Sequence, residues 1–142
     1  MLLAILFFIS QKCLHNCKVA KLFTVEEANI LLPQVRELVE KILAARKEAL
    51  SKRPDLWPVL ETAAGNGGSK KAGELLAVFT RFEKAVLALQ KMGCELKGIE
   101  QGLVDFPAEM HGRQVYLCWK YNEPEILFWH DIDAGFAGRQ RL

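Results

Sequence analysis

The chain has 142 residues, enough for one domain with a single modest core. Hydrophobic residues make up 51% and charged residues 25%, an ordinary globular balance, and the net charge of +2 is too small to indicate a polyanionic partner. From residue 96 onward seven acidic side chains outnumber five basic ones. Because phosphate contacts need clustered cations, we expect no nucleic-acid partner.

Residues 1–9, MLLAILFFI, form an apolar run that is too short to span a bilayer as a helix. No basic residue precedes the run and no small-x-small cleavage site follows it, which disfavours a signal peptide. Three interpretations stay open: translation that starts at Val19 through a GTG codon, a weak membrane anchor, or secretion. We expect residues 1–20 to be a leader outside the fold and residues 21–142 to form a single α+β domain. We expect no stable membrane insertion and a cytoplasmic location, with weak membrane association through 1–9 as the alternative.

The leader also contains the pattern C-x-H-x-C, formed by Cys13, His15 and Cys17. Thiolates and imidazole are zinc ligands, but structural zinc sites usually combine a C-x2–4-C pair with a second ligand pair. No second pair is near. We therefore interpret these three residues as accidental to function.

Two long amphipathic helices are predicted after the leader. Thr24 and Glu27 fit a capping box, and apolar residues at helical spacing follow to about Lys52. Pro33 lies inside this pattern and should bend the helix. A second pattern runs from about Lys71 to Met92, with its apolar face predicted at Ala72, Leu75, Leu76, Phe79, Phe82, Val86 and Leu89. The two helices are expected to form an antiparallel hairpin.

The apolar period then changes to two, which indicates strands. We predict strands over 103–106, ended by Pro107, over 114–119 and over 125–130, with residues 96–99 as a fourth. The short connections favour an antiparallel meander. The predicted fold is therefore α+β, a long antiparallel helical hairpin packed on a small antiparallel β-sheet of three to four strands.

A homodimer is expected through the helix 24–52. At 1.5 Å per residue this helix is about 40 Å long, whereas ordinary strands are about 17–20 Å long. The sheet is therefore too small to cover it. The apolar stripe left over, including Leu32, Val39 and Ile42, is predicted to meet a second copy of the chain.

Five motifs occur in a fixed order along the chain: FTVEEANILLP at 23–33, then GLVDFP, GRQVYLCW, ILFWH and GFAGR. In these motifs the chain resembles a family of small prokaryotic proteins known only as a domain of unknown function. The resemblance covers residues 21–141. It implies one continuous fold over that range and carries no activity with it.

His130 ends the last predicted strand and is followed by Asp131 and Asp133. A histidine beside carboxylates can be a metal site, a general base or a hydrogen-bonded structural pair, and all three remain open. Asp105 lies in an apolar strand and needs a partner, for which Arg113 and Arg139 are candidates. The predicted ligand-binding residues are Asp105, Arg113, Trp119, Trp129, His130 and Arg139, and the metal candidates are His130, Asp131 and Asp133.

Cys118 would be a nucleophile only if a base such as His130 lowered its pKa, and otherwise it is a small buried hydrophobe. The sequence identifies neither a cofactor nor a catalytic residue. It favours a small binding, regulatory or scaffolding domain that acts as a homodimer. The alternative is a small metal-dependent or acid–base hydrolytic enzyme that uses Asp105, His130 and Asp131.

Overall fold

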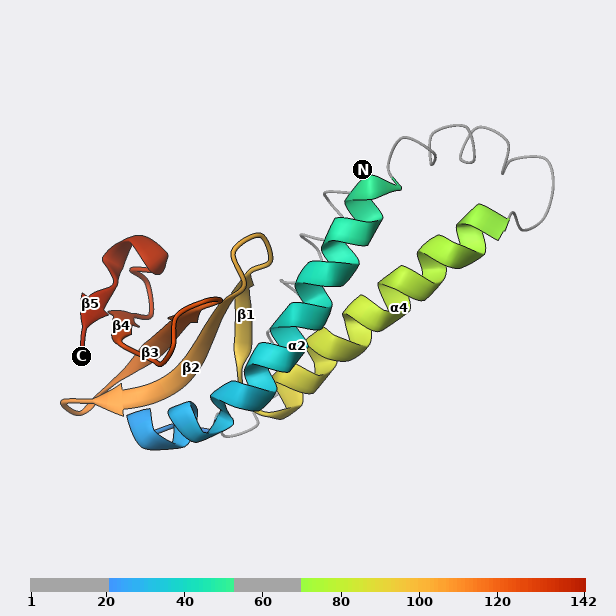
Figure 1. Ribbon diagram of the computed structural model, residues 1–142. Coiled ribbons are helices and arrows are strands. Elements are labelled where there is room, and N and C mark those ends of the chain that lie inside the picture. The colour runs from blue at the N-terminus through green and yellow to red at the C-terminus, as the bar shows by residue number, and fades with distance from the viewer. Residues whose placement is uncertain (1–20, 53–69) are drawn as a thin grey trace.

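The computed structural model describes residues 21–52 and 70–142 of the chain. They form two helices, α2 (Val25–Ser51) and α4 (Lys70–Lys91), and a five-stranded antiparallel sheet. Figure 1 shows the helices side by side next to the sheet, with their far ends extending beyond it. The α+β class is confirmed. The predicted leader, 1–20, and the connection between the helices, 53–69, lie outside the described residues.

Helix α2 begins and ends where the sequence predicts. The Thr24 hydroxyl accepts from the Glu27 amide at 3.1 Å, and the Glu27 carboxylate accepts from the Thr24 amide at 3.0 Å, so the capping box is complete. Pro33 lies inside the helix, and the ribbon bends in its blue N-terminal part (Figure 1). The buried face is made of Ala28, Leu32, Val35, Val39, Ile42 and Ala45.

That buried face overturns the predicted dimer stripe. Leu32 is 4% exposed, and Val39 and Ile42 are fully buried in the chain's own core. The three side chains pack against α4 and the sheet, so they are not left over for a second copy.

Of its described residues, helix α4 has none buried in the first two turns. The buried residues are Val78, Phe82, Ala85, Val86 and Leu89, whereas Leu76, predicted on the inner face, is 67% exposed. The prediction for Leu76 is wrong because 3.6 residues per turn place it on the side of α4 opposite Val78 and Ala85, whereas Leu75 of the same turn is half-buried. Ala72, also predicted on the inner face, is exposed. Gly93 follows the helix at a φ of +90°, the left-handed conformation that ends helices at glycine.

The sheet has the order β1-β2-β3-β4-β5, so each strand pairs with its neighbour in sequence. This confirms the antiparallel meander, but the number of strands is five and not three to four. The short last strand was not predicted, since two residues show no period. The strands are β1 (Glu95–Gly98), β2 (Leu103–Met110), β3 (Arg113–Lys120), β4 (Phe128–Asp131) and β5 (Gln140–Arg141).

Pro107 does not end β2, contrary to the prediction. The strand continues to Met110, and Pro107 pairs with Tyr116 of β3. The carbonyl of Pro107 accepts from the Phe23 amide at 2.8 Å on the side away from β3. In a strand the amide position of a residue points to the same side as its carbonyl, so the missing N–H of proline removes no bond to β3.

The two faces of the sheet differ. Val104, Phe106 and Ala108 of β2 are buried in the core that the strands share with the helices. Asp105 alternates with them and therefore points to the opposite face. Within the described ranges no helix has an apolar stretch long enough to cross a bilayer.

Candidate functional site: a buried Asp–Cys–His cluster

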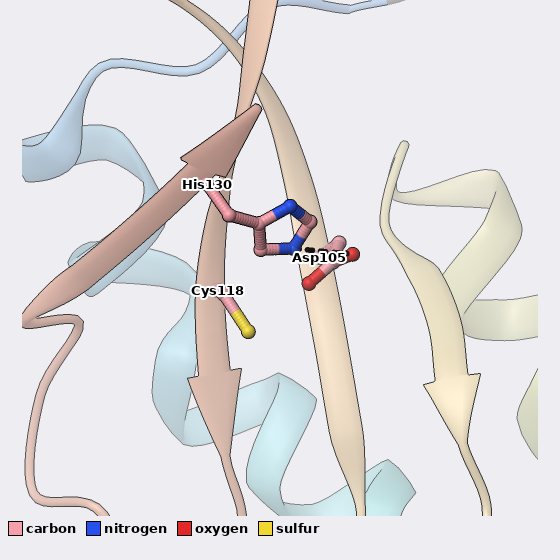
Figure 2. Close-up of side chains that lie close together, drawn as sticks. All are labelled: Asp105, Cys118 and His130. Atoms are coloured by element: carbon pink, nitrogen blue, oxygen red, sulfur yellow. Dashed lines mark hydrogen bonds and ion pairs between the residues drawn. The ribbon is translucent and has the colours of Figure 1, made fainter. Parts of the chain in front are cut away.

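Three neighbouring strands bring Asp105, Cys118 and His130 together. Asp105 of β2 is directly opposite Cys118 of β3, and β3 pairs in turn with β4, which carries His130. Figure 2 shows the three side chains on the same face of the sheet, with helical ribbon behind it. The predicted strands 103–106 and 125–130 are therefore not neighbours. Asp105 of β2 and His130 of β4 instead approach each other across β3.

The tautomer of His130 follows from its two hydrogen bonds. Nδ1 lies 2.8 Å from the backbone carbonyl oxygen of Asp131, which can only accept, so Nδ1 carries a hydrogen and donates it. Nε2 lies 3.2 Å from Oδ2 of Asp105. A proton must stand between these two atoms, either on the carboxyl group or on the imidazole.

Burial dominates the electrostatics of the cluster. Asp105, Cys118 and His130 are each at most 2% exposed. Desolvation raises the pKa of Asp105 above its usual value, and the Cys118 thiol and the His130 imidazole oppose that rise. Oδ1 of Asp105 is buried, and the described residues include no hydrogen-bond partner for it.

Cys118 does not have the environment of a nucleophile. Burial first, and the neighbouring Asp105 carboxylate second, raise the pKa of its thiol to about 12. A reactive cysteine needs the opposite, a lowered pKa at an accessible position. The geometry therefore favours Cys118 as a small buried residue and not as a nucleophile.

Tyr116 lies beside the cluster on the same face. Its ring centre is 5.7 Å from that of His130, and its hydroxyl donates to Oε1 of Glu95 at 3.2 Å. Lys97 lies over the Tyr116 ring at 4.7 Å and pairs with Glu95 at 2.6 Å. The Tyr116 ring is half-buried and covers the cluster beside His130. The ion pair of Glu95 and Lys97 holds this ring in place.

Arg139 belongs to a second polar cluster. Its Nη2 donates to Oε2 of Glu123 at 2.7 Å and to the Cys118 carbonyl at 3.1 Å, and its guanidinium lies 4.2 Å from the centre of the Phe128 ring. Glu123 Oε2 also accepts from the Lys120 amide at 2.8 Å. Arg139 thus fixes the C-terminal turn onto the connection between β3 and β4.

The remaining predicted residues lie apart from the Asp–Cys–His cluster. Trp119 and Trp129 pair with Val104 and Leu117 and share the opposite, helix-covered face. Arg113 pairs with Asp131 at 3.3 Å and lies 5.6 Å from the Trp129 ring centre. Asp133 is exposed. Asp105 therefore has His130 as its partner, whereas Arg113 and Arg139 have other carboxylates.

Among the described residues, the group with donor atoms close enough for a metal ion is Asp105, Cys118 and His130, whose donors all lie within 4.8 Å of one another. Asp131 and Asp133 are not part of it. The sequence indicates Cys118 as a nucleophile or a small buried hydrophobe but not as a metal ligand, and it does not single out Glu123. Alternation in β3 places Cys118 on the face opposite Trp119, but its position beside Asp105 depends on a strand register that the sequence does not display.

Two hollows lie elsewhere on the molecule. The larger, about 480 Å³, is bounded by the start of α2, the end of β2 and Leu117 of β3, and its lining includes Phe23, Glu26, Ala108 and Met110. The smaller, about 70 Å³, includes Leu22, Pro107, Tyr116 and Ile132. Neither is lined by Asp105, Cys118 or His130, so the cluster does not open into either hollow.

Comparison with known proteins relates the chain to one family. Neither the curated proteins nor the solved structures provide a match. A family model described as an uncharacterized conserved protein matches residues 21–142, which are most of the chain and include both helices and all five strands. The chain therefore belongs to the uncharacterized conserved protein family DUF2203.

Proposed function

We propose that the protein is a small cytoplasmic binding, regulatory or scaffolding domain that acts as a homodimer and performs no chemistry of its own. The domain comprises residues 21–142, with residues 1–20 as a leader outside the fold. Its two helices form a hairpin. Two ion pairs between the helices support the antiparallel arrangement. The side chains of Lys52 and Glu74 are 3.0 Å apart, and those of Glu48 and Arg81 are 2.7 Å apart.

The observation that carries this proposal is the burial of the polar groups. An enzyme needs its acid, base or nucleophile to meet substrate in an open pocket. Here Asp105 and His130 pair with each other at 2% exposure, and Cys118 is protonated at neutral pH because its pKa is about 12. Groups held in this way stabilise a sheet rather than reach a substrate.

Of the predicted ligand-binding residues, Arg113 is the accessible one, with a side chain that is 57% exposed. Its guanidinium carbon lies 5.6 Å from the centre of the Trp129 ring. We assign the ligand or partner contact to this part of the predicted set, because Arg139 is half-buried in its pair with Glu123 and the other members are buried.

The dimer contact is assigned to the projecting ends of the helices. The large apolar side chains exposed there are Leu50 at 48% and Leu76 at 67%. Side chains of this size are usually covered when they gather at one place on a protein surface. Leu50 and Leu76 take the place of Leu32, Val39 and Ile42 as the proposed contact, because the core of the chain already covers those three.

Light scattering on the full chain at micromolar concentration tests the proposal. We expect a dimer, and we expect Leu50→Glu or Leu76→Glu to convert it to a monomer with an unchanged circular dichroism spectrum. Ile132→Glu, at an equally exposed apolar residue far from the helix ends, is the matched control and should remain dimeric. A wild-type monomer at all concentrations would contradict the homodimer.

The enzymatic alternative rests on the Asp105–His130 hydrogen bond, since a paired histidine and carboxylate are common in acid–base catalysis. Its third member, Asp131, contributes its carbonyl to His130 but turns its carboxylate to Arg113. Hydrolysis of a generic ester or phosphoester that is lost in His130→Asn, with the fold retained, would favour the alternative.

A further inference from the structure

We propose that Asp105, Cys118 and His130 form a binding site for one zinc ion. The site is closed and structural, and it joins β2, β3 and β4. It differs from the predicted metal candidates, because Cys118 and Asp105 replace Asp131 and Asp133 as ligands. It is independent of the proposed binding or scaffolding function, which needs no metal.

The first support is the donor set and its spacing. A thiolate, an imidazole and a carboxylate are the three ligand types that zinc takes in proteins, and the sulfur ligand favours zinc over magnesium and calcium. Zinc bonds of about 2.0–2.3 Å place tetrahedral donors roughly 3.3–3.8 Å apart. The donor atoms of Asp105, Cys118 and His130 lie within 4.8 Å of one another, so small side-chain rotations bring all three onto one ion.

The second support is the orientation of His130. Metal-binding histidines usually donate the hydrogen of the second ring nitrogen to a carbonyl or carboxylate, which fixes the tautomer and directs the other nitrogen at the metal. Nδ1 of His130 donates to the Asp131 carbonyl at 2.8 Å, and Nε2 faces Asp105. Nε2 is therefore directed into the cluster before any ion binds, and it can bind the ion once the proton between it and Asp105 has left.

The third support is Oδ1 of Asp105, a buried oxygen that no N–H or O–H donor of the described residues reaches, so that besides His130 the carboxylate has only the weak Cys118 thiol. Buried polar atoms are nearly always paired, so an unpaired carboxylate oxygen calls for an explanation. With Oδ1 as a second oxygen from Asp105, the zinc ion has four protein donors in a distorted tetrahedral arrangement, because the two oxygens of one carboxylate lie closer together than two tetrahedral positions.

The charge balance is also favourable. Without metal, the cluster holds one proton on the Cys118 thiol and one between Asp105 and His130. A divalent ion takes the place of these two protons, which leave to solvent, so the buried site carries the same net charge before and after binding. A large change of charge at this depth would be unfavourable.

Cobalt binding tests the site directly. The experiment uses the full chain with Cys13→Ser and Cys17→Ser, so that the C-x-H-x-C pattern of the leader does not bind metal. After metal removal, Co²⁺ is added and the absorption spectrum recorded. We expect a sulfur-to-cobalt charge-transfer band and intense visible bands of tetrahedral cobalt at one ion per chain, both displaced by Zn²⁺.

Cys118→Ser and His130→Asn should each remove a ligand. Loss of an outer-sphere partner already weakens metal sites by about 10–100-fold, so we expect a larger loss of affinity here. Cys94→Ser, at the other buried cysteine of the described residues, is the matched control and should leave the spectrum unchanged. The melting temperature of the background protein, measured with and without Zn²⁺, covers the case in which a ligand variant does not fold.

An absence of the charge-transfer band in the Cys13→Ser/Cys17→Ser protein would overturn the proposal. So would a band that survives Cys118→Ser. A melting temperature that stays the same when Zn²⁺ is added would also exclude a structural zinc ion.

Discussion

Arg139 and Glu123 form a half-buried ion pair that holds the C-terminal turn against the connection between β3 and β4. Nη2 lies 2.7 Å from Oε2, and the side chains are 12% and 20% exposed. The backbone carbonyl of Glu123 also accepts from Trp119 Nε1 and from Arg36 of α2, each at 3.0 Å. The residue thus connects a helix, the sheet and the C-terminus.

Replacing Arg139 by alanine should therefore destabilise the fold. Removal of one partner of a buried pair costs about 3–5 kcal/mol, and the partial exposure here points to the lower end of that range. Urea unfolding measures the loss. Arg141→Ala, at an exposed residue two positions later, should change the free energy of unfolding by less than about 0.5 kcal/mol. Equal effects of the two substitutions would show that the Glu123 contact is unimportant.

His130→Ala should be strongly destabilising at pH 7, by about 3 kcal/mol, because it leaves the Asp105 carboxylate buried without its partner. Burial already raises the pKa of Asp105 in the folded state. The stability linked to such a group is present at low pH and is lost as the pH rises through the folded-state pKa. The deficit of His130→Ala relative to wild type should therefore shrink as the pH falls from 7 towards 4.

Two further variants serve as controls for the His130→Ala experiment. Asp105→Asn combined with His130→Ala removes the buried charge and should recover part of the loss at pH 7. His111→Asn, at an exposed histidine with a φ of +53°, keeps a residue that tolerates this backbone conformation and should have little effect. A deficit that does not vary with pH would show that the missing volume, not the carboxylate, is responsible.

The buried thiols predict a loss of stability at alkaline pH. Burial raises the pKa of Cys94 to about 12, above its ordinary value of 9.0. Between these values the unfolded chain releases a proton that the folded chain keeps, so stability falls as the pH rises from 9 towards 12. The slope of unfolding free energy against pH over this interval should be less steep in Cys94→Ala than in wild type. Identical slopes would show that the thiol does not contribute.

Phe23 should be essential although it precedes the first helix. Its ring is 3% exposed and packs edge-on against Phe106 at 5.5 Å. Truncation of a buried phenylalanine costs about 3–5 kcal/mol, and we expect Phe23→Ala to lie in that range. Deletion of residues 1–18, by contrast, should leave the melting temperature unchanged. A fall of several degrees on deletion would show that the leader packs on the domain.

Gly102 should tolerate no side chain. It has a φ of +62°, and a Cβ atom there would lie 2.7 Å from Val39 Cγ1 and 2.8 Å from Tyr121 Cβ. Gly112 is the matched control, with a φ of +76° and nothing within 4 Å of a Cβ. The left-handed conformation alone makes alanine unfavourable by about 1–2 kcal/mol at both positions. Gly102→Ala should lose roughly 1–3 kcal/mol more than Gly112→Ala, because overpacking adds to that penalty.

The helices were predictable because their signals are local. The capping box of Thr24 and Glu27 involves residues three apart, and the apolar period repeats over many turns. Leu76 was placed on the inner face by that same period. The apolar residues of α4 fit more than one helical face, and the packing decides which face turns inward, so that Val78 and Ala85 are buried and Leu76 is exposed.

The candidate site was only partly predictable for a similar reason. Asp105 was recognised as a carboxylate in need of a partner, and His130 as a polar residue near a strand end. The partner itself depends on the order of strands and on their register, which place Cys118 opposite Asp105 and His130 one strand further. A one-residue slip would send Cys118 to the helix side.

The contact of Phe23 with Pro107 has a consequence for aggregation. β1 covers β2 only as far as Asp105, so the rest of β2 would be an open edge to which a strand of another molecule could add. An incoming strand meets a proline with no N–H to offer, and a carbonyl that the Phe23 amide already occupies at 2.8 Å. The segment before α2 thus prevents the sheet from growing into an intermolecular one along this edge.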